Sequence, residues 1–208
     1  MTARITQLAV GLVAYAVSIA LMVRAGLGAT PWAVLHQGLA AHTGASFGAV
    51  TAVTGAVVLA CWIPLRQRPG LGTLANVVVI SAVVNPALAV LARLEDPLPM
   101  PVRAVMLATG VVLNALATAL YVGAGMGPGP RDGLMTGLVA RTGWPLRAVR
   151  TSIEVCVVAA GWLLGGTAGL GTLAYALAIG PLVHLLLPRL TRPAATARAA
   201  APAVLDPT

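Results

Sequence analysis

The sequence block Gly70-Leu71-Gly72-Thr73-Leu74-Ala75 recurs unchanged as Gly169-Leu170-Gly171-Thr172-Leu173-Ala174, 99 residues further along the chain. The same shift, with no gap, aligns a second Gly-rich stretch, Ala25-Gly26-Leu27-Gly28-Ala29-Thr30-Pro31, with Ala124-Gly125-Met126-Gly127-Pro128-Gly129-Pro130. Self-similarity at a fixed spacing indicates a fold built from repeated units. The sequence therefore predicts two copies of one structural unit.

The composition indicates that these units lie in a membrane. Of the 208 residues, 59% are hydrophobic and only 9% are charged, and the mean hydropathy is +0.93. A soluble domain needs many more charged residues to cover its surface. Apolar segments near the roughly 20 residues that a spanning helix needs run over residues 5–23, 47–65, 72–92, 104–122, 148–164 and 171–187. The sequence thus predicts an all-α polytopic helix bundle with six transmembrane helices and the lipid bilayer as its partner.

The basic residues are better explained by membrane topology than by nucleic acid. All thirteen are Arg, they give a net charge of +8, and they fall between the apolar segments rather than in one patch. Nucleic-acid binding is therefore not expected. Three spanning helices per copy, an odd number, predict that the two copies enter the membrane from opposite faces, as an inverted repeat.

The distribution of Arg tests this orientation, because cytoplasmic loops collect basic residues. With both termini cytoplasmic, nine Arg lie inside and three lie outside, and Arg150, just within the predicted fifth spanning helix, is counted on neither side. The inside set is Arg4, Arg66, Arg68, Arg131, Arg141, Arg147, Arg189, Arg192 and Arg198, and the outside set is Arg24, Arg93 and Arg103. The predicted organisation is a first membrane repeat over 1–93, a connecting loop over 94–103, a second membrane repeat over 104–188 and a disordered cytoplasmic tail over 189–208.

Each copy also contains a stretch that is too long for a turn and too short to span the membrane, at residues 25–46 and 124–146. Each stretch begins with a Gly/Pro-rich turn and continues as a short apolar helix, Pro31–Ala41 or Pro130–Ala140. Paired interrupted segments at matching positions of inverted halves indicate a transporter site, because a helix that starts within the membrane directs its N–H groups toward the midplane. These helices are either re-entrant or interfacial.

Six polar residues are candidates for binding a small molecule or ion. Arg131 and Asp132 open the second short helix, where they bind a polar ligand or serve only as a topology marker and a helix-start carboxylate. Glu154 lies within an apolar segment with Arg150 one turn earlier. This pair is either a packing ion pair or a proton or substrate relay. His36 and Gln37 complete the set, although a single membrane His is more often a packing group.

Glycine spacing suggests a further contact. Gly129, Gly133 and Gly137 recur every four residues and allow close helix approach, either within the chain or in a homodimer.

Four stretches resemble the YczE/YitT-type bacterial integral membrane proteins. They are Pro31-Trp32-Ala33-Val34-Leu35-His36-Gln37-Gly38, Pro64-Leu65-Arg66-Gln67-Arg68-Pro69-Gly70, Gly129-Pro130-Arg131-Asp132-Gly133-Leu134-Met135 and Arg150-Thr151-Ser152-Ile153-Glu154. The resemblance spans nearly residues 10–188 and implies a multi-pass protein of the bacterial plasma membrane. It carries no substrate with it. Ala33 and Asn85 stand where that family typically has acidic residues.

These observations favour a small-molecule or ion permease with inverted repeats. The alternative is a non-transporting membrane scaffold or partner subunit that binds another membrane protein. The sequence contains no Ser–His–Asp set, no paired-carboxylate site and no metal-ligand spacing. An enzyme, a cofactor and a bound metal are therefore not expected.

Overall fold

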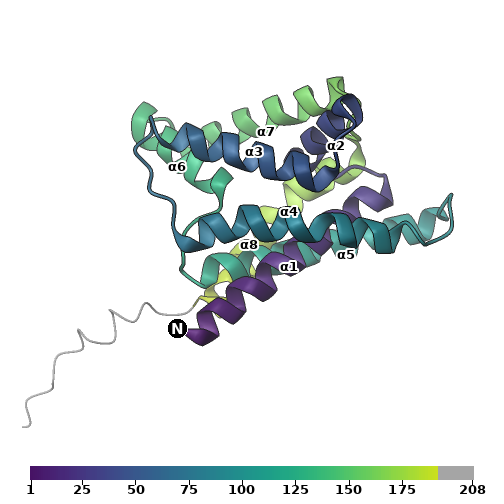
Figure 1. Ribbon diagram of the computed structural model, residues 1–208, viewed down its shortest axis with the longest axis horizontal. Coiled ribbons are helices and arrows are strands. Elements are labelled where there is room, and N and C mark those ends of the chain that lie inside the picture. Colours follow the sequence, from purple (N-terminus) through teal and green to yellow (C-terminus); the bar gives the residue numbers. More distant parts are fainter. Residues whose placement is uncertain (192–208) are drawn as a thin grey trace, which may run out of the picture.

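The computed structural model describes residues 1–191, which form an all-helical bundle (Figure 1). The helices are α1 (Thr2–Ala25), α2 (Pro31–Thr43), α3 (Phe47–Trp62), α4 (Leu71–Leu91), α5 (Met100–Gly123), α6 (Pro130–Thr142), α7 (Leu146–Leu163) and α8 (Leu170–Leu190). This confirms the predicted all-α class. Helix α8 extends to Leu190, two residues into the predicted tail, and residues 192–208 of that tail lie outside the described residues.

Glycine and proline set the limits of the two short helices, as the sequence predicts. In α2, the Thr30 side chain caps the first turn by accepting a hydrogen bond from the backbone N–H of Ala33, and Pro31 is the first helical residue. Gly44 ends the helix in the left-handed conformation, with φ 71°. Helix α6 likewise has Pro as its first residue and ends at a left-handed glycine, Gly143, but no side chain caps its first turn, and both helices are two residues longer than predicted.

Length and composition identify four helices that can cross a membrane: α1, α4, α5 and α8. Helices α2 and α3 together make a fifth candidate that is bent by 116°. Helix α3 alone has 16 residues, short of the roughly 20 that a span needs, and the 18-residue α7 contains Arg147, Arg150 and Glu154. All six predicted segments are helical, but these criteria give four to five spans rather than six.

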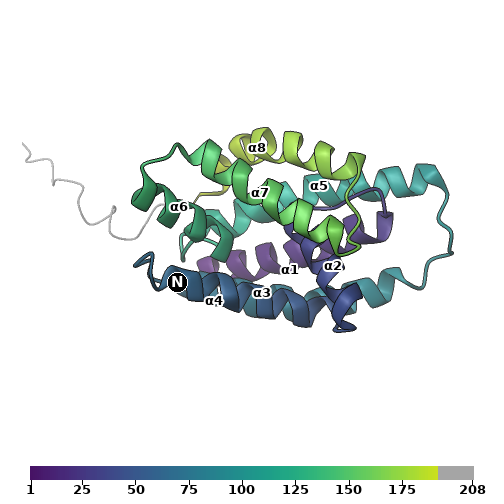
Figure 2. The same cartoon turned by 90° about the horizontal axis from the view of Figure 1, so that it is seen from above.

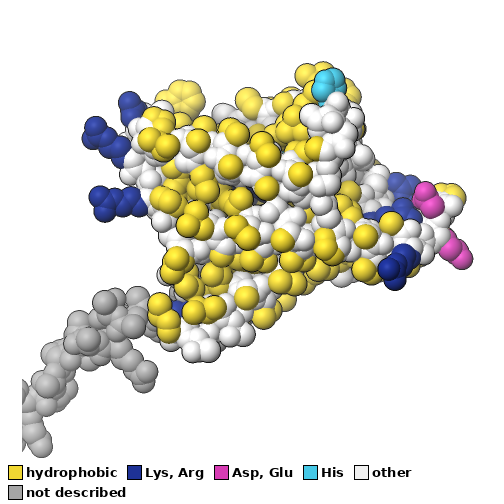
Figure 3. Space-filling view, in the orientation of Figure 1, with side chains coloured by type: hydrophobic (Ala, Val, Ile, Leu, Met, Phe, Trp, Pro, Cys, Tyr) yellow, Lys and Arg dark blue, Asp and Glu magenta, His cyan; other side chains and the backbone are white. Residues whose placement is uncertain are grey.

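Apolar side chains cover much of the outer surface, as expected of a protein whose solvent is lipid (Figure 3). Large exposed residues lie along the candidate spans, among them Val53, Val57, Leu74, Val78 and Leu177. A soluble protein rarely exposes so many in one contiguous surface.

Helices α1 and α5 form the antiparallel centre of the bundle. Arg103, at the start of α5, donates hydrogen bonds to the carbonyl oxygens of Ala25 and Gly26 at the end of α1. At the other end, Gln7 of α1 donates to the carbonyl oxygen of Leu120 at 3.0 Å. In Figure 2, α3 and α4 lie along one side of the molecule and α7 and α8 along the other.

Equivalent helices of the two copies pack reciprocally: α2 contacts α7 while α6 contacts α3, and α1 contacts α4 while α5 contacts α8. The Gly-rich turns are joined in the same reciprocal way. The Gly72 N–H donates to the Met126 carbonyl at 2.8 Å, and the Gly171 N–H donates to the Leu27 carbonyl at 2.8 Å. Under the 99-residue shift, Gly72 matches Gly171 and Leu27 matches Met126. Each copy therefore donates the same hydrogen bond to the Gly-rich turn of the other copy.

Polar residues within the bundle mostly join helices, as expected of interhelical hydrogen bonds. Fully buried Asn114 of α5 donates to Ser18 Oγ of α1 at 2.8 Å and accepts from the Tyr175 hydroxyl of α8 at 2.9 Å. Asn85 of α4 likewise accepts from the Gly48 backbone N–H and donates to Ser46 Oγ. These contacts fix the relative positions of α1, α3, α4, α5 and α8.

Candidate functional site

Two neighbouring cavities lie where the first turns of α2 and α6 approach each other. The smaller has a volume of about 70 Å³ and lies against α3 and α4, and the larger, more open one has about 440 Å³ and lies against α7 and α8. Both are lined by the same five residues: Tyr15, Trp32, Tyr121, Arg131 and Asp132. One polar wall, contributed by α1, α2, α5 and α6, therefore separates a cavity beside the first copy from a cavity beside the second.

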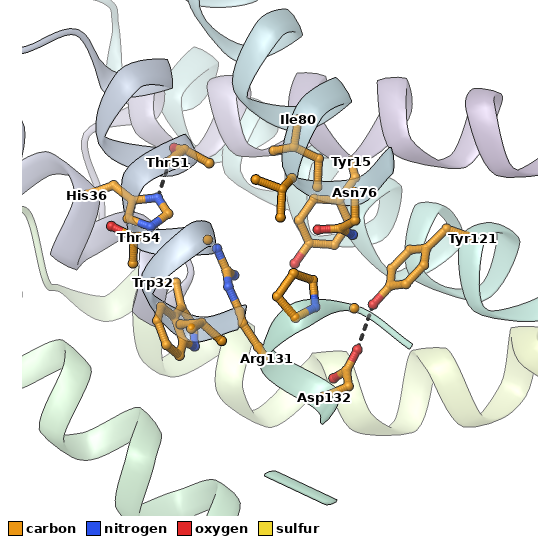
Figure 4. Close-up of a pocket in the computed structure, with 15 residues that line it drawn as sticks. Tyr15, Trp32, His36, Thr51, Thr54, Asn76, Ile80, Tyr121, Arg131 and Asp132 are labelled. Carbon is orange, nitrogen blue, oxygen red and sulfur yellow. Dashed lines mark hydrogen bonds between the residues drawn. The ribbon is translucent and has the colours of Figure 1, made fainter. Parts of the chain in front are cut away.

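Arg131 and Trp32 form the centre of this wall (Figure 4). Each is the second residue of its short helix, and the Arg131 guanidinium carbon lies 4.8 Å from the centroid of the Trp32 ring. This is cation–π geometry. The ion pairs among the described residues are Arg24–Asp96 and Arg150–Glu154, so no carboxylate of this part of the chain lies within ion-pair distance of Arg131. Its charge is therefore available to the cavities.

Asp132 points away from Arg131 toward Tyr121 (Figure 4). The Tyr121 hydroxyl donates to Asp132 Oδ2 at 2.8 Å, and Tyr121 itself packs edge-to-face against Tyr15. A carboxylate in the first turn of a helix is also stabilised by the helix dipole. The wall thus has a cationic side at Arg131 and an anionic side at Asp132.

Arg150 and Glu154 line the larger cavity from α7. Arg150 Nε lies 2.9 Å from Glu154 Oε1, which confirms the predicted ion pair between residues one turn apart. The pair is partly exposed, with side-chain accessibilities of 46% and 23%. It places two opposite charges on the wall of the larger cavity, which Asp132 also lines.

His36 lines the smaller cavity and is only 1% exposed. Its Nδ1 lies 3.1 Å from Thr51 Oγ1 on α3, and its ring packs edge-to-face on Phe47. Its Nε2 has no hydrogen-bond partner among the described residues. The indole Nε1 of Trp32 is likewise buried without a partner there. Two polar atoms of α2 thus lack a partner beside the same cavity.

Gln37 lies apart from the other candidate residues. Its Oε1 accepts a hydrogen bond from the Thr167 backbone N–H at 2.9 Å, in the connection between α7 and α8, and it lines neither cavity. The reason is the helical turn: Gln37 follows His36 by 100° and so faces α7 while His36 faces α3. The structure brings the other five candidates to the cavity walls.

The glycines of α6 pack within the chain. A Cβ atom on Gly133 would overlap the ring of Trp62, and one on Gly137 would lie 3.0 Å from Gln67 Cγ. The four-residue spacing that suggested a homodimer face therefore serves the contact between α6 and the end of α3. The Trp62 indole also donates to the Pro130 carbonyl at 2.9 Å, which fixes the start of α6.

Three residues of the wall are not among the six candidates predicted from the sequence: Tyr15, Trp32 and Tyr121. The 99-residue shift contains a signal for one of them, because it aligns Trp32 with Arg131. It also aligns Asn76, in the smaller cavity, with Tyr175, and Tyr15 with Asn114. The first copy thus has Tyr on α1 and Asn on α4, whereas the second copy has Asn on the matching helix α5 and Tyr on the matching helix α8.

Comparisons with known proteins agree with this membrane architecture. The model of a family described as "Family of unknown function (DUF6198)" matches residues 2–188. An "Uncharacterized protein" of Haemophilus influenzae is 40% identical over 167 residues, which are 80% of this chain and 75% of that protein. The "Uncharacterized membrane protein YczE" of Bacillus subtilis is 31% identical over 181 residues, 86% of this chain and 83% of that protein. No solved structure matches. The apolar spanning helices and the extent of these matches together show that the chain is a membrane protein of the YczE type and belongs to the family of unknown function DUF6198.

Proposed function

We propose that the chain is a permease for a small molecule or ion, with its binding site at the wall between the two cavities. The observation that carries the proposal is the convergence of the first turns of α2 and α6, one from each copy, on both cavities. In transporters built from inverted repeats, interrupted helices of the two halves meet at the substrate site. A wall shared by two cavities is where a bound solute can be exposed first to one cavity and then to the other.

The proposal includes six membrane crossings by two inverted three-span repeats. The antiparallel packing of α1 and α5 supports it, because these helices hold matching places in the two copies. The reciprocal hydrogen bonds of Gly72 and Gly171 support it as well. In this arrangement α3 and α7 are the second spans of their copies, and the charged residues of α7 face a cavity instead of lipid.

We also propose that both termini face the cytoplasm and that the membrane is the bacterial plasma membrane. In the view of Figure 3, the end of the molecule that carries the N-terminus shows Arg side chains and no acidic side chain, whereas the acidic side chains visible in this view lie at the opposite end, beside further Arg (Figures 1 and 3). At that opposite end, Arg24 is paired with Asp96 at 3.3 Å, and Arg103 binds the last carbonyl groups of α1. These two Arg therefore have structural roles that account for their place outside.

The proposal assigns no catalytic reaction to the chain. A homodimer stays a prediction. Gly133 and Gly137, which suggested it, pack inside the chain and so do not support it. The alternative role, a scaffold or partner subunit, requires no solute site.

Ligand-dependent thermal stabilisation tests the permease, because a solute that binds only the folded state must raise the unfolding temperature. The purified chain is heated with a panel of small anions, cations, amino acids and neutral metabolites. A permease predicts a saturable rise in unfolding temperature for one chemical class of solute. If no solute raises the unfolding temperature of the folded protein, the permease proposal is wrong and the scaffold role is favoured.

A further inference from the structure

We infer that the pocket between Arg131, Trp32 and His36 binds an oxyanion group, either a carboxylate or an inorganic oxyanion. This inference rests on the proposed permease and names the class of its solute. Three observations carry it: an unpaired indole N–H, an unpaired guanidinium and the uncapped start of α6.

The indole of Trp32 requires an acceptor. Trp32 is only 7% exposed, and its Nε1 has no hydrogen-bond partner within the described residues. An indole N–H donates and cannot accept, and a buried donor without a partner destabilises the folded state. The comparison with Trp62 is direct, because the Trp62 N–H is satisfied by the Pro130 carbonyl at 2.9 Å. A ligand that stands beside Trp32 Nε1 must therefore offer a lone pair.

The guanidinium of Arg131 requires the same chemistry. It carries five N–H donors and no acceptor, and its 4.8 Å contact with the Trp32 ring keeps it beside the indole. No ion pair satisfies it in the described part of the chain. Guanidinium groups bind carboxylates and other oxyanions through two parallel hydrogen bonds. Asp132 does not take this place, because its carboxylate points toward Tyr121 (Figure 4).

His36 and the start of α6 also face the same pocket. Thr51 donates its hydroxyl proton to the Phe47 carbonyl at 2.8 Å, so His36 Nδ1 donates to Thr51 Oγ1 and His36 Nε2 carries a lone pair. His36 therefore lines the pocket without adding a donor. Helix α6 begins at Pro130, and Gly129 before it has no side chain to cap the first turn, so the first N–H groups, from Arg131 onward, and the positive end of the helix dipole stay available. Gly129, Pro130 and Arg131 all line the cavity.

The volume limits the size of the ligand. A cavity of about 70 Å³ exceeds the roughly 10–15 Å³ that a single water molecule requires. It therefore suits a small oxyanion such as formate, acetate, nitrate or phosphate. A larger carboxylate must extend into the second cavity past Tyr121 and Asp132.

The experiment measures anion binding by the purified full-length chain in detergent. Unfolding temperature is recorded against the concentration of sodium formate, acetate, nitrate, phosphate or glycine, at an ionic strength held constant with sodium chloride. At least one oxyanion is expected to give a saturable rise, and the salt that does so distinguishes a carboxylate from an inorganic oxyanion. Arg131→Gln is expected to abolish the rise.

Trp32→Phe is the sharpest variant, because it keeps an aromatic ring under Arg131 and removes the unpaired donor together with the rest of the pyrrole ring. It is expected to weaken oxyanion binding by about tenfold or more. Without an oxyanion, the removal of the buried unpaired donor is expected to offset part of the cost of the smaller side chain. Trp144→Phe is the matched control, since Trp144 is 59% exposed and lies outside both cavities. It should leave binding unchanged.

Three results would overturn the inference: no oxyanion acts beyond chloride, or the rise survives in both Trp32→Phe and Arg131→Gln, or only cations or neutral solutes bind. Flux in proteoliposomes separates this failure from failure of the permease. Oxyanion binding without flux supports the pocket and contradicts the permease. Flux of a cation or neutral solute that Arg131→Gln leaves unchanged supports a permease and contradicts the oxyanion pocket.

Discussion

Trp32 and Arg131 occupy the same position in the two copies, 99 residues apart, and contact each other, with the guanidinium carbon 4.8 Å from the centre of the ring. In the proposed arrangement of inverted repeats, equivalent residues of the two copies can touch only near the two-fold axis. The proposal therefore places this cation–π contact at the junction of the two copies.

The energetic coupling of this pair is open to measurement. In a double-mutant cycle of Arg131→Gln and Trp32→Leu, we expect a coupling free energy of about 0.5–2 kcal/mol in the stability of the folded protein. The measurement is reversible unfolding in detergent for the wild type, both single variants and the double variant. Additive effects would show that the two side chains do not interact.

The reciprocal Gly turns predict equal sensitivity in the two copies. A Cβ on Gly28 would lie 2.7 Å from the Thr172 backbone nitrogen, and one on Gly127 would lie 2.9 Å from Thr73 Oγ1. Both residues also have a left-handed φ, of +113° and +123°. Gly28→Ala and Gly127→Ala are therefore each expected to destabilise the protein by about 2–4 kcal/mol, from strain plus overpacking.

Gly44→Ala and Gly143→Ala are the matched controls for these variants. They share a left-handed φ of about +71°, but no atom lies within 4 Å of the added Cβ. Their expected cost is only about 1–2 kcal/mol. Thermal unfolding of all four variants decides the point, and equal losses in turns and controls would show that the contacts between copies carry no energy.

The buried Ser18–Asn114–Tyr175 network predicts a modest loss on removal of one hydroxyl. Tyr175→Phe removes the 2.9 Å hydrogen bond to Asn114 Oδ1 and is expected to cost about 0.5–1.5 kcal/mol, the range for interhelical hydrogen bonds in membranes. Tyr15→Phe is the control, because no hydrogen bond of the Tyr15 hydroxyl is present within residues 1–191. Equal unfolding temperatures for the two variants would argue against the network.

The proposed topology predicts opposite labelling of two loops. In a chain with Cys61→Ala and Cys156→Ala, single cysteines are introduced as Arg68→Cys and Glu95→Cys. A membrane-impermeant maleimide added to whole cells should label the cysteine at position 95 and leave the one at position 68 unlabelled until the cells are opened. Labelling of both from outside would contradict the six-span arrangement, and the reverse pattern would invert the termini.

The sequence predicted the helices well because their signals are local. Apolar runs, Pro at the first helical position and Gly at the end gave six longer helices and two short ones within a few residues, and the 99-residue shift related them. Residues one turn apart also gave the Arg150–Glu154 pair.

The wall of the site was less predictable, because it depends on tertiary contacts. Tyr15 and Tyr121 reach it only through the crossing of α1 with α5, where a Cβ on Gly11 would lie 2.8 Å from the Tyr121 backbone nitrogen. Gln37 was placed in the site although it faces the α7–α8 connection. No local pattern distinguishes the side of α2 that packs on α7 from the side that packs on α3.

The most direct test of the permease is uptake of the solute that stabilises the protein, measured in proteoliposomes that contain the purified chain. We expect saturable uptake by the wild type, and loss of uptake in Asp132→Asn and in Glu154→Gln with unchanged protein content, because both carboxylates line the larger cavity. Glu95→Gln, in the connection between α4 and α5, is the control and should transport normally. Uptake that persists in both cavity variants, or absence of uptake by a wild-type protein that binds the solute, would contradict the account.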